Sequence, residues 1–100
     1  MSRDNQHNYY VYIRTNEHHT VFYTGATNSL SRRSAEHRCD IQNSFVNKYN
    51  INKLVYYEHT DNIESAITRE KALKKLNRRN KVLLINKFNP LWKDLKDDDQ

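Results

Sequence analysis

Two runs of aromatic and β-branched residues near the N-terminus limit the possible folds more than any other feature of this sequence. Residues 9–15 read Tyr-Tyr-Val-Tyr-Ile-Arg-Thr, and residues 20–24 repeat that composition after a polar stretch at positions 16–19. Such residues favour β-strands, and two runs separated by a short polar stretch are typical of a hairpin. The sequence therefore predicts a β-hairpin at this end of the chain.

The only glycine of the chain, Gly25, follows the second run directly. Glycine is often required where the backbone has a positive φ or approaches another group closely. We therefore expect the second strand to turn into a helix there, with Thr27 or Asn28 as the cap. The inner stripe of that helix would contain Leu30, Arg33 or Ser34, His37 and Ile41.

The second half of the chain reads as one strand followed by two helices. Residues 54–58 have strand composition, and residues 61–64 have the pattern of a capping box that opens a helix running to about Asn77. A last helix over residues 81–88 ends at Asn89-Pro90, because a residue before proline disfavours helical backbone.

The length of 100 residues suits one compact domain. We expect residues 1–8 to be a flexible N-terminus, residues 9–95 to form the folded domain, and residues 96–100 to be a flexible acidic tail. Within the domain, Trp92 and Leu95 should fold back onto the core.

The net charge of +5 favours an anionic partner, such as nucleic acid or an acidic membrane surface. No apolar run approaches the roughly 20 residues that a membrane span needs, and the N-terminus lacks the apolar region of a signal peptide. The lone Cys39 cannot form an intrachain disulfide, which fits a reducing compartment. We therefore expect an intracellular protein that does not bind a membrane. It would be cytoplasmic or, in a eukaryotic or viral setting, nuclear.

Glu70 stands at the centre of an otherwise apolar helical stripe. The other members of the stripe are Ile63, Ala66, Ile67 and Leu73. An ionised carboxylate in that position requires a cation, either an arginine in a structural ion pair or a divalent metal.

Four other side chains share an explanation with Glu70 if that residue holds a metal. Taken singly, Tyr12 and Tyr23 are most simply packed strand residues, Arg33 extends its charge to solvent, and His37 is a satisfied histidine of the core or its rim. Phosphodiester cleavage accounts for all five together. Glu70 would hold the metal, Arg33 would neutralise developing charge, and tyrosine and histidine would handle water and protons.

A basic segment follows this carboxylate. Eight of the 17 lysines and arginines lie between Ser65 and Lys87, where Glu70 is the only acid. A charge run is most often a solvated surface, but cations that contact phosphate belong near the bond to be cut. We expect nucleic acid to contact Arg32, Lys74, Lys75, Arg78 and Arg79.

Specific motifs run through the chain from residue 9 to about residue 95. They are Tyr-Val-Tyr-Ile at 10–13, Tyr-Thr-Gly-Ala-Thr-Asn-Ser-Leu-Ser-Arg-Arg at 23–33 with Glu-His at 36–37, Lys-Leu-Val-Tyr-Tyr-Glu at 53–58, Ala-Ile-Thr-Arg-Glu-Lys-Ala-Leu-Lys at 66–74, and Asn-Pro-Leu-Trp-Lys-Asp-Leu at 89–95. Together they resemble the GIY-YIG nuclease superfamily, specifically its small single-domain members related to the UvrC N-terminal domain.

The resemblance implies a three-stranded antiparallel sheet flanked by helices, over residues 9–95, and metal-dependent endonucleolytic cleavage of DNA. A single carboxylate implies one ion, Mg²⁺ or Mn²⁺. Some small relatives are similar in acting on single-stranded DNA, and a basic surface with tyrosines that stack bases would suit that substrate.

The resemblance also implies roles for individual residues. Tyr12 and Tyr23 match the motif tyrosines, one of which acts as general base or positions the attacking water, and both remain candidates. Arg33 matches the arginine that stabilises the pentacovalent phosphate, and His37 matches the histidine that accompanies it. Glu70 matches the metal-binding glutamate.

Asn89 matches a site asparagine of the family, although the residues alone indicate only a helix stop. Tyr10 stands where the motif name has glycine, and Thr24 replaces the usual isoleucine of the second motif. By strand alternation Thr24 points away from Tyr23, so this change affects packing more than chemistry.

Two alternatives predict other functions. A non-catalytic nucleic-acid-binding module would keep the fold and its basic face, but it would not need Glu70 on an apolar stripe. A protein-interaction or assembly domain would present the basic helix as a solvated surface and would have no affinity for nucleic acid at low salt.

Overall fold

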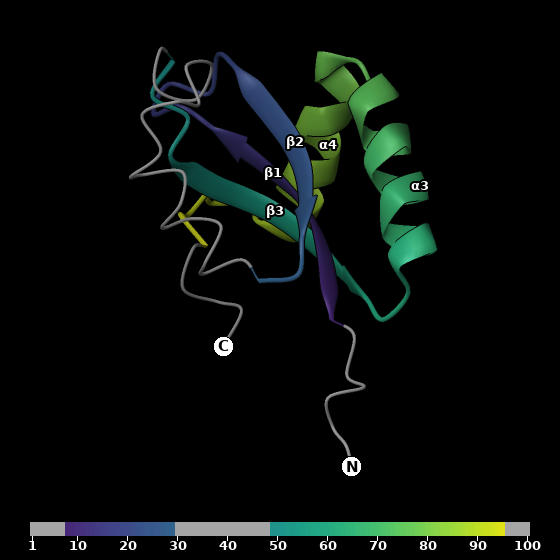
Figure 1. Cartoon of the computed structure of the whole chain (residues 1–100). Coiled ribbons are helices and arrows are strands. Elements are labelled where there is room, and N and C mark those ends of the chain that lie inside the picture. Colours follow the sequence, from purple (N-terminus) through teal and green to yellow (C-terminus); the bar gives the residue numbers. More distant parts are fainter. Residues whose placement is uncertain (1–7, 30–48, 96–100) are drawn as a thin grey trace.

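The computed structural model describes residues 8–29 and 49–95, which form a three-stranded antiparallel sheet and two helices (Figure 1). The sheet has the order β2-β1-β3. In chain order, the elements are β1 (Tyr9–Thr15), β2 (Phe22–Thr27), β3 (Lys53–Thr60), α3 (Ile63–Lys75) and α4 (Arg78–Phe88). The predicted fold class is therefore confirmed. In the part of the chain that the structure describes, none of the helices has the length and apolar character to cross a membrane.

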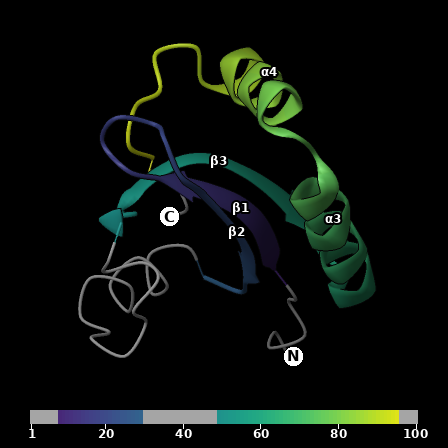
Figure 2. The same cartoon turned by 90° about the horizontal axis from the view of Figure 1, so that it is seen from above.

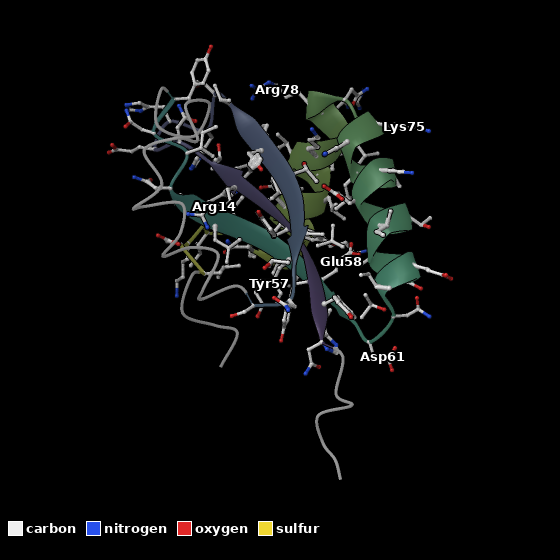
Figure 3. All side chains as sticks on the ribbon, viewed as in Figure 1. Arg14, Tyr57, Glu58, Asp61, Lys75 and Arg78 are labelled. Carbon is white, nitrogen blue, oxygen red and sulfur yellow. The ribbon has the colours of Figure 1, made fainter. Side chains whose placement is uncertain are left out.

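The central strand β1 sends alternate side chains to two different surroundings. Val11 and Ile13 belong to the main core, which α3 and α4 complete from one side of the sheet (Figure 2). Tyr12 faces the opposite side and packs with Leu54 of β3. Because side chains alternate along a strand, Arg14 shares the face of Tyr12. Figure 3 shows Arg14 on the side away from α3.

The pairing of β1 with β3 contains a bulge. Ile13 lies opposite Tyr56, whereas Arg14 lies opposite Leu54, so Val55 is the additional residue on β3. Val55 is fully buried, and its carbonyl accepts a hydrogen bond of 3.1 Å from the side-chain amide of Asn89.

Asn89 also ties the end of α4 to the C-terminal segment. Its amide nitrogen donates to the carbonyl of Lys93 at 2.9 Å, and its Oδ1 accepts from the Lys93 backbone N–H at 3.1 Å. Trp92 packs against the main core and Leu95 against the Tyr12 cluster, as predicted from the sequence.

The helix boundaries differ from the sequence-based expectation. α3 ends at Lys75 rather than near Asn77, and α4 begins at Arg78 rather than at Lys81. Asn77 is the reason, because its side chain accepts from the Asn80 backbone N–H at 2.9 Å and caps a new helix. Asn62 caps α3 in the same way, accepting from the backbone N–H of residue 65 at 3.0 Å.

The predicted inward stripe of α3 is only partly correct. Ala66 and Leu73 are buried, but Ile63 and Ile67 remain 51% and 43% exposed. Glu70 lies at the margin of the buried face, half-buried rather than central. Apolar spacing alone predicted a wider contact than this helix makes with the sheet.

The predicted end of the second strand is wrong. β2 continues through Gly25 to Thr27, because its pairing with β1 extends to Tyr10 opposite Thr27. The described glycine does not have a positive φ. The helix expected after Thr27 or Asn28 falls on residues outside the described ranges, and so do Arg32, Arg33 and His37.

We predict that Asn89→Ala lowers the free energy of unfolding by about 2–3 kcal/mol, since it leaves the buried Val55 carbonyl without its amide partner. Urea denaturation followed by circular dichroism measures this loss. Asn80→Ala is the matched control on the exposed face of α4 and should change stability by less than about 0.5 kcal/mol. Equal losses in the two variants would contradict this role of Asn89.

Candidate active site on the tyrosine face of the sheet

Tyr12 and Tyr23 lie side by side on neighbouring strands. Tyr12 is opposite Gly25 and Tyr23 is opposite Arg14, which places both tyrosines on the same face of the sheet. Their ring centroids are 6.4 Å apart with an interplanar angle of 75°, an edge-to-face contact. Tyr12 is 1% exposed, whereas Tyr23 is half-buried. The two predicted motif tyrosines therefore form one aromatic pair with a buried and an accessible member.

Gly25 makes this arrangement possible because it has no Cβ. A Cβ built on Gly25 would lie 2.6 Å from the Tyr12 hydroxyl oxygen and 2.8 Å from Cζ of the same ring. The ring of Tyr12 therefore occupies the space that any other residue at position 25 would fill. The close approach considered from the sequence is present, but it occurs within a strand and not at a turn into a helix.

Arg14 is a buried cation on the tyrosine face. Its side chain is 2% exposed, and it lies between Tyr23 on β2 and Leu54 on β3 in the sheet register. An arginine keeps its charge at any physiological pH. A fixed positive charge in a low-dielectric setting favours negative charge nearby. Sequence reasoning missed this residue, although its position two residues after Tyr12 placed it on that face.

Glu70 forms an ion pair with Lys74 across one turn of α3. The two charged atoms, Nζ and Oε2, are 3.2 Å apart, and the side chains are 56% exposed for Lys74 and 24% exposed for Glu70. The cation that the sequence required is thus a lysine in this structure, not an arginine. An exposed pair at this spacing contributes only about 0.3–0.5 kcal/mol, so Lys74 is easily displaced.

The donor set at Glu70 fits a hard divalent ion. Mg²⁺ is commonly held by one or two carboxylates, with water and phosphate oxygens as its remaining ligands. Glu70 offers one partly exposed carboxylate to such an ion. Within residues 8–29 and 49–95, there is no group of three or more His, Cys, Asp or Glu residues that could enclose a metal.

α3, which carries Glu70, lies on the core face of the sheet. The helix packs against β1 and β2, and Figure 1 shows it next to β2. Tyr23 lies on that same edge strand, on the face opposite to the main core. Glu70 and the tyrosine pair are therefore carried by neighbouring elements.

A second carboxylate, Glu58 on β3, lies on the α3 side of the sheet (Figure 3). Arg69 donates from Nε to both Glu58 oxygens at 2.8 and 3.1 Å and from Nη2 to Oε2 at 2.9 Å. The Tyr56 hydroxyl donates to the same Oε2. Sequence analysis missed this cluster, because no periodic pattern pairs a strand residue with a helix residue 11 positions later.

The electrostatics of this cluster follow from its contacts. Burial opposes the charge of Glu58, but the hydrogen bonds from Arg69 and Tyr56 outweigh it and hold the pKa of the Glu58 carboxyl below its ordinary value. Burial, followed by the hydrogen bond to Glu58, raises the pKa of the Tyr56 hydroxyl. At neutral pH, Glu58 is therefore ionised, and Tyr56 keeps its proton and donates it in the hydrogen bond.

Four of the five predicted nucleic-acid-binding cations, Lys74, Lys75, Arg78 and Arg79, lie where α3 meets α4, and Figure 3 shows Lys75 and Arg78 at this end of the helices. Arg32 lies outside the described ranges. Arg78 has structural partners: its Nη1 donates to the His19 carbonyl at 3.1 Å, and its Nη2 donates to the carbonyl of residue 20. Its guanidinium also lies 5.0 Å from the ring centroid of Phe22. Lys75 and Arg79 are exposed.

Known proteins are similar to this chain over most of its length. The family model described as the GIY-YIG catalytic domain matches residues 8–83. A UPF0213 protein of Listeria welshimeri is 32% identical over 81 residues, which are 81% of this chain and 87% of the relative. A UPF0213 protein of Clostridium perfringens is 36% identical over 77 residues, which are 77% of this chain and 82% of the relative. No solved structure matches the chain.

The family model over residues 8–83 identifies a catalytic domain of nuclease type, and the three-stranded antiparallel sheet with its helices is consistent with that fold. The chain belongs to the GIY-YIG catalytic domain family, and the relatives above are small UPF0213 proteins. Membership implies a nuclease-type function on nucleic acid with a divalent metal.

We predict that Gly25→Ala destabilises the protein by about 1–3 kcal/mol, because the new methyl group must displace the buried Tyr12 ring. The loss should shrink to less than about 1 kcal/mol when the same change is made in a Tyr12→Leu background, since the clashing atoms are gone. Chemical denaturation of the four proteins measures the coupling. The same cost in both backgrounds would show that Gly25 is required for another reason.

Proposed function

We propose that this protein is a DNA endonuclease that hydrolyses phosphodiester bonds by tyrosine-assisted attack of water, with one Mg²⁺ or Mn²⁺ ion at Glu70. The observation that carries the proposal is the contact between Tyr12 and Tyr23 over Gly25, which presents two phenol groups on one face beside the buried cation of Arg14. We assign the nuclease domain to residues 9–95.

Each of the proposed site residues has a separate role in the reaction. Tyr23, the accessible member of the pair, orients water or accepts its proton, and Tyr12 alternatively does so from the buried side. Arg33 stabilises the charge of the pentacovalent phosphate, and His37 assists proton transfer. Glu70 holds the ion, which when bound supplies Lewis-acid polarisation of phosphate oxygens.

Asn89 supports the site through the fold. Both ends of its amide are engaged with backbone groups of Val55 and Lys93, which fixes β3 and the C-terminal segment. We therefore propose that Asn89 is a positioning residue that holds β3, the strand that pairs with the Tyr12 strand.

The tyrosine face favours a substrate with accessible bases. Tyr10 and Tyr57 pack edge-to-face at 6.1 Å on the same side as Tyr12, and both are half-buried. The faces of partly exposed aromatic rings on a basic protein stack unpaired bases without regard to sequence. Single-stranded or branched DNA is therefore the substrate that we propose.

The ion pair between Glu70 and Lys74 favours a second candidate, a nucleic-acid-binding module without catalysis, because that pair already satisfies the carboxylate. A titration with Mn²⁺ discriminates between the two functions. Loss of Mn²⁺ binding in Glu70→Gln supports the nuclease. Spectral signals from residues around Glu70 that do not change at high Mn²⁺ concentration support the module.

We predict that Glu70→Gln lowers the cleavage rate of end-labelled single-stranded DNA by at least about 100-fold in Mg²⁺ or Mn²⁺, since a lost metal ligand removes several kcal/mol of transition-state stabilisation. Arg33→Ala should cause a similar loss. Glu64→Gln, in the exposed first turn of the same helix, is the matched control and should cleave normally. Near-normal turnover by Glu70→Gln would refute the assignment of the metal site.

We predict that Lys75→Ala and Arg79→Ala each weaken DNA binding and reduce the slope of log K against log salt by about one unit, because each exposed cation releases counterions from one phosphate. Lys87→Ala, at the far end of α4, is the control and should leave the slope unchanged. Fluorescence anisotropy in catalytically silent Ca²⁺ measures the affinities. Affinity that does not depend on salt would rule out phosphate contacts.

A further inference from the structure

Arg69 and Glu70 are neighbours on α3, and Arg69 is anchored to the sheet. We propose that the Glu58–Arg69 pair is a positioning device that sets the direction of the Glu70 carboxylate toward its divalent ion. This inference rests on the proposed function, since it assigns Glu70 the role of metal ligand. It gives a function to a charged cluster that the chemistry of cleavage does not itself use.

The anchor is directional, unlike the apolar contacts of the helix. Two nitrogens of the Arg69 guanidinium make three hydrogen bonds of 2.8 to 3.1 Å to the two oxygens of Glu58. A planar fork bound to a carboxylate in this way admits little rotation of either group. The fork thereby ties the side chain of residue 69 to β3 and limits how far α3 can turn away from that strand.

The apolar contacts of α3 leave its rotation weakly determined. Only Ala66 and Leu73 are buried on this helix, and Ile63 and Ile67, which would have widened the contact, are largely exposed. A narrow stripe of one small and one large residue tolerates a helix turning about its axis. The Arg69 fork restricts that turning, and Glu70 is the next residue along the chain.

The Glu58 side of the device is itself fixed. The Tyr56 hydroxyl donates to Glu58 Oε2, and Tyr56 is 5% exposed in the main core. Both Glu58 oxygens are therefore engaged by protein donors. Glu58 is occupied as an acceptor, so of Glu58 and Glu70 it is Glu70 whose carboxylate can turn to an ion.

The cluster stabilises the fold only modestly, since the side chains of Arg69 and Glu58 are 46% and 28% exposed. Solvent screens a pair with that exposure. The three hydrogen bonds and the supporting tyrosine fix the direction of both groups, whatever they add to stability. A role in orientation accounts for the additional contacts.

The test compares Mn²⁺ affinity, measured by isothermal titration calorimetry, in the wild type and in Arg69→Met, Glu58→Gln and Glu70→Gln. Charge alone predicts that Arg69→Met binds Mn²⁺ more tightly, because a positive charge beside the site is gone and Glu58 is left as an additional anion. Positioning predicts the opposite, a three- to tenfold weaker affinity. Circular dichroism confirms that each variant is folded at the titration temperature.

Two further variants and a control sharpen the comparison. Arg69→Lys keeps the charge but cannot form the fork, so it should weaken Mn²⁺ binding as Arg69→Met does. The double variant Glu58→Gln/Arg69→Met should bind Mn²⁺ no more weakly than the single variant with the lower affinity, since both changes break the same pair. Glu64→Gln, on the same helix, is the control and should bind as the wild type does.

The outcomes separate failure of this inference from failure of the proposed function. If Mn²⁺ binds the wild type but not Glu70→Gln, while Arg69→Met binds as well as or better than the wild type, the positioning role is overturned and the nuclease assignment stands. If the wild type and Glu70→Gln do not differ in Mn²⁺ affinity, the metal site of the proposed function fails, and this inference fails with it.

Discussion

The central place of β1 in the sheet is the constraint on which the rest of the structure depends. A strand paired on both sides can bury both faces, so Val11 and Ile13 complete the helical core while Tyr12 packs on the other side. Tyr12 lies over the backbone of its neighbour only because that neighbour is Gly25. The same pairing that stabilises the sheet therefore presents the tyrosines, and fold and site cannot be altered independently.

Much of the fold followed from composition and spacing. The aromatic run that became β1 was predicted with its observed bounds, because seven consecutive residues favoured one structure without a competing signal. Two helices were predicted here, but their boundaries around Asn77 were less accurate, since the cap that the Asn77 side chain forms is not part of the apolar pattern. Local hydrogen bonds of this kind leave little trace in apolar periodicity.

The candidate site was predicted unevenly for a physical reason. Tyr12 and Tyr23 come from adjacent strands whose register a hairpin largely determines, so their proximity could be inferred. The contact of Glu58 with Arg69 depends on how α3 is rotated against the sheet, which the isoleucines of its stripe indicated incorrectly. Strand alternation alone places Arg14 on the tyrosine face. Arginine is rarely fully buried, so the sequence did not predict this residue as part of the site.

Glu58 on β3 and Glu70 on α3 differ in how freely their carboxylates can change partners. Glu58 has a lowered pKa, and its oxygens are held by a guanidinium fork and a phenol, so it is fixed in charge and direction. Glu70 is held by one flexible lysine on the same helix, an interaction that a divalent ion or a phosphate can replace at little cost. A rigid anion beside an exchangeable one is the arrangement expected if the first orients the helix and the second takes part in binding. On the proposed assignment, the fold separates the structural use of a carboxylate on β3 from the chemical use of another on α3.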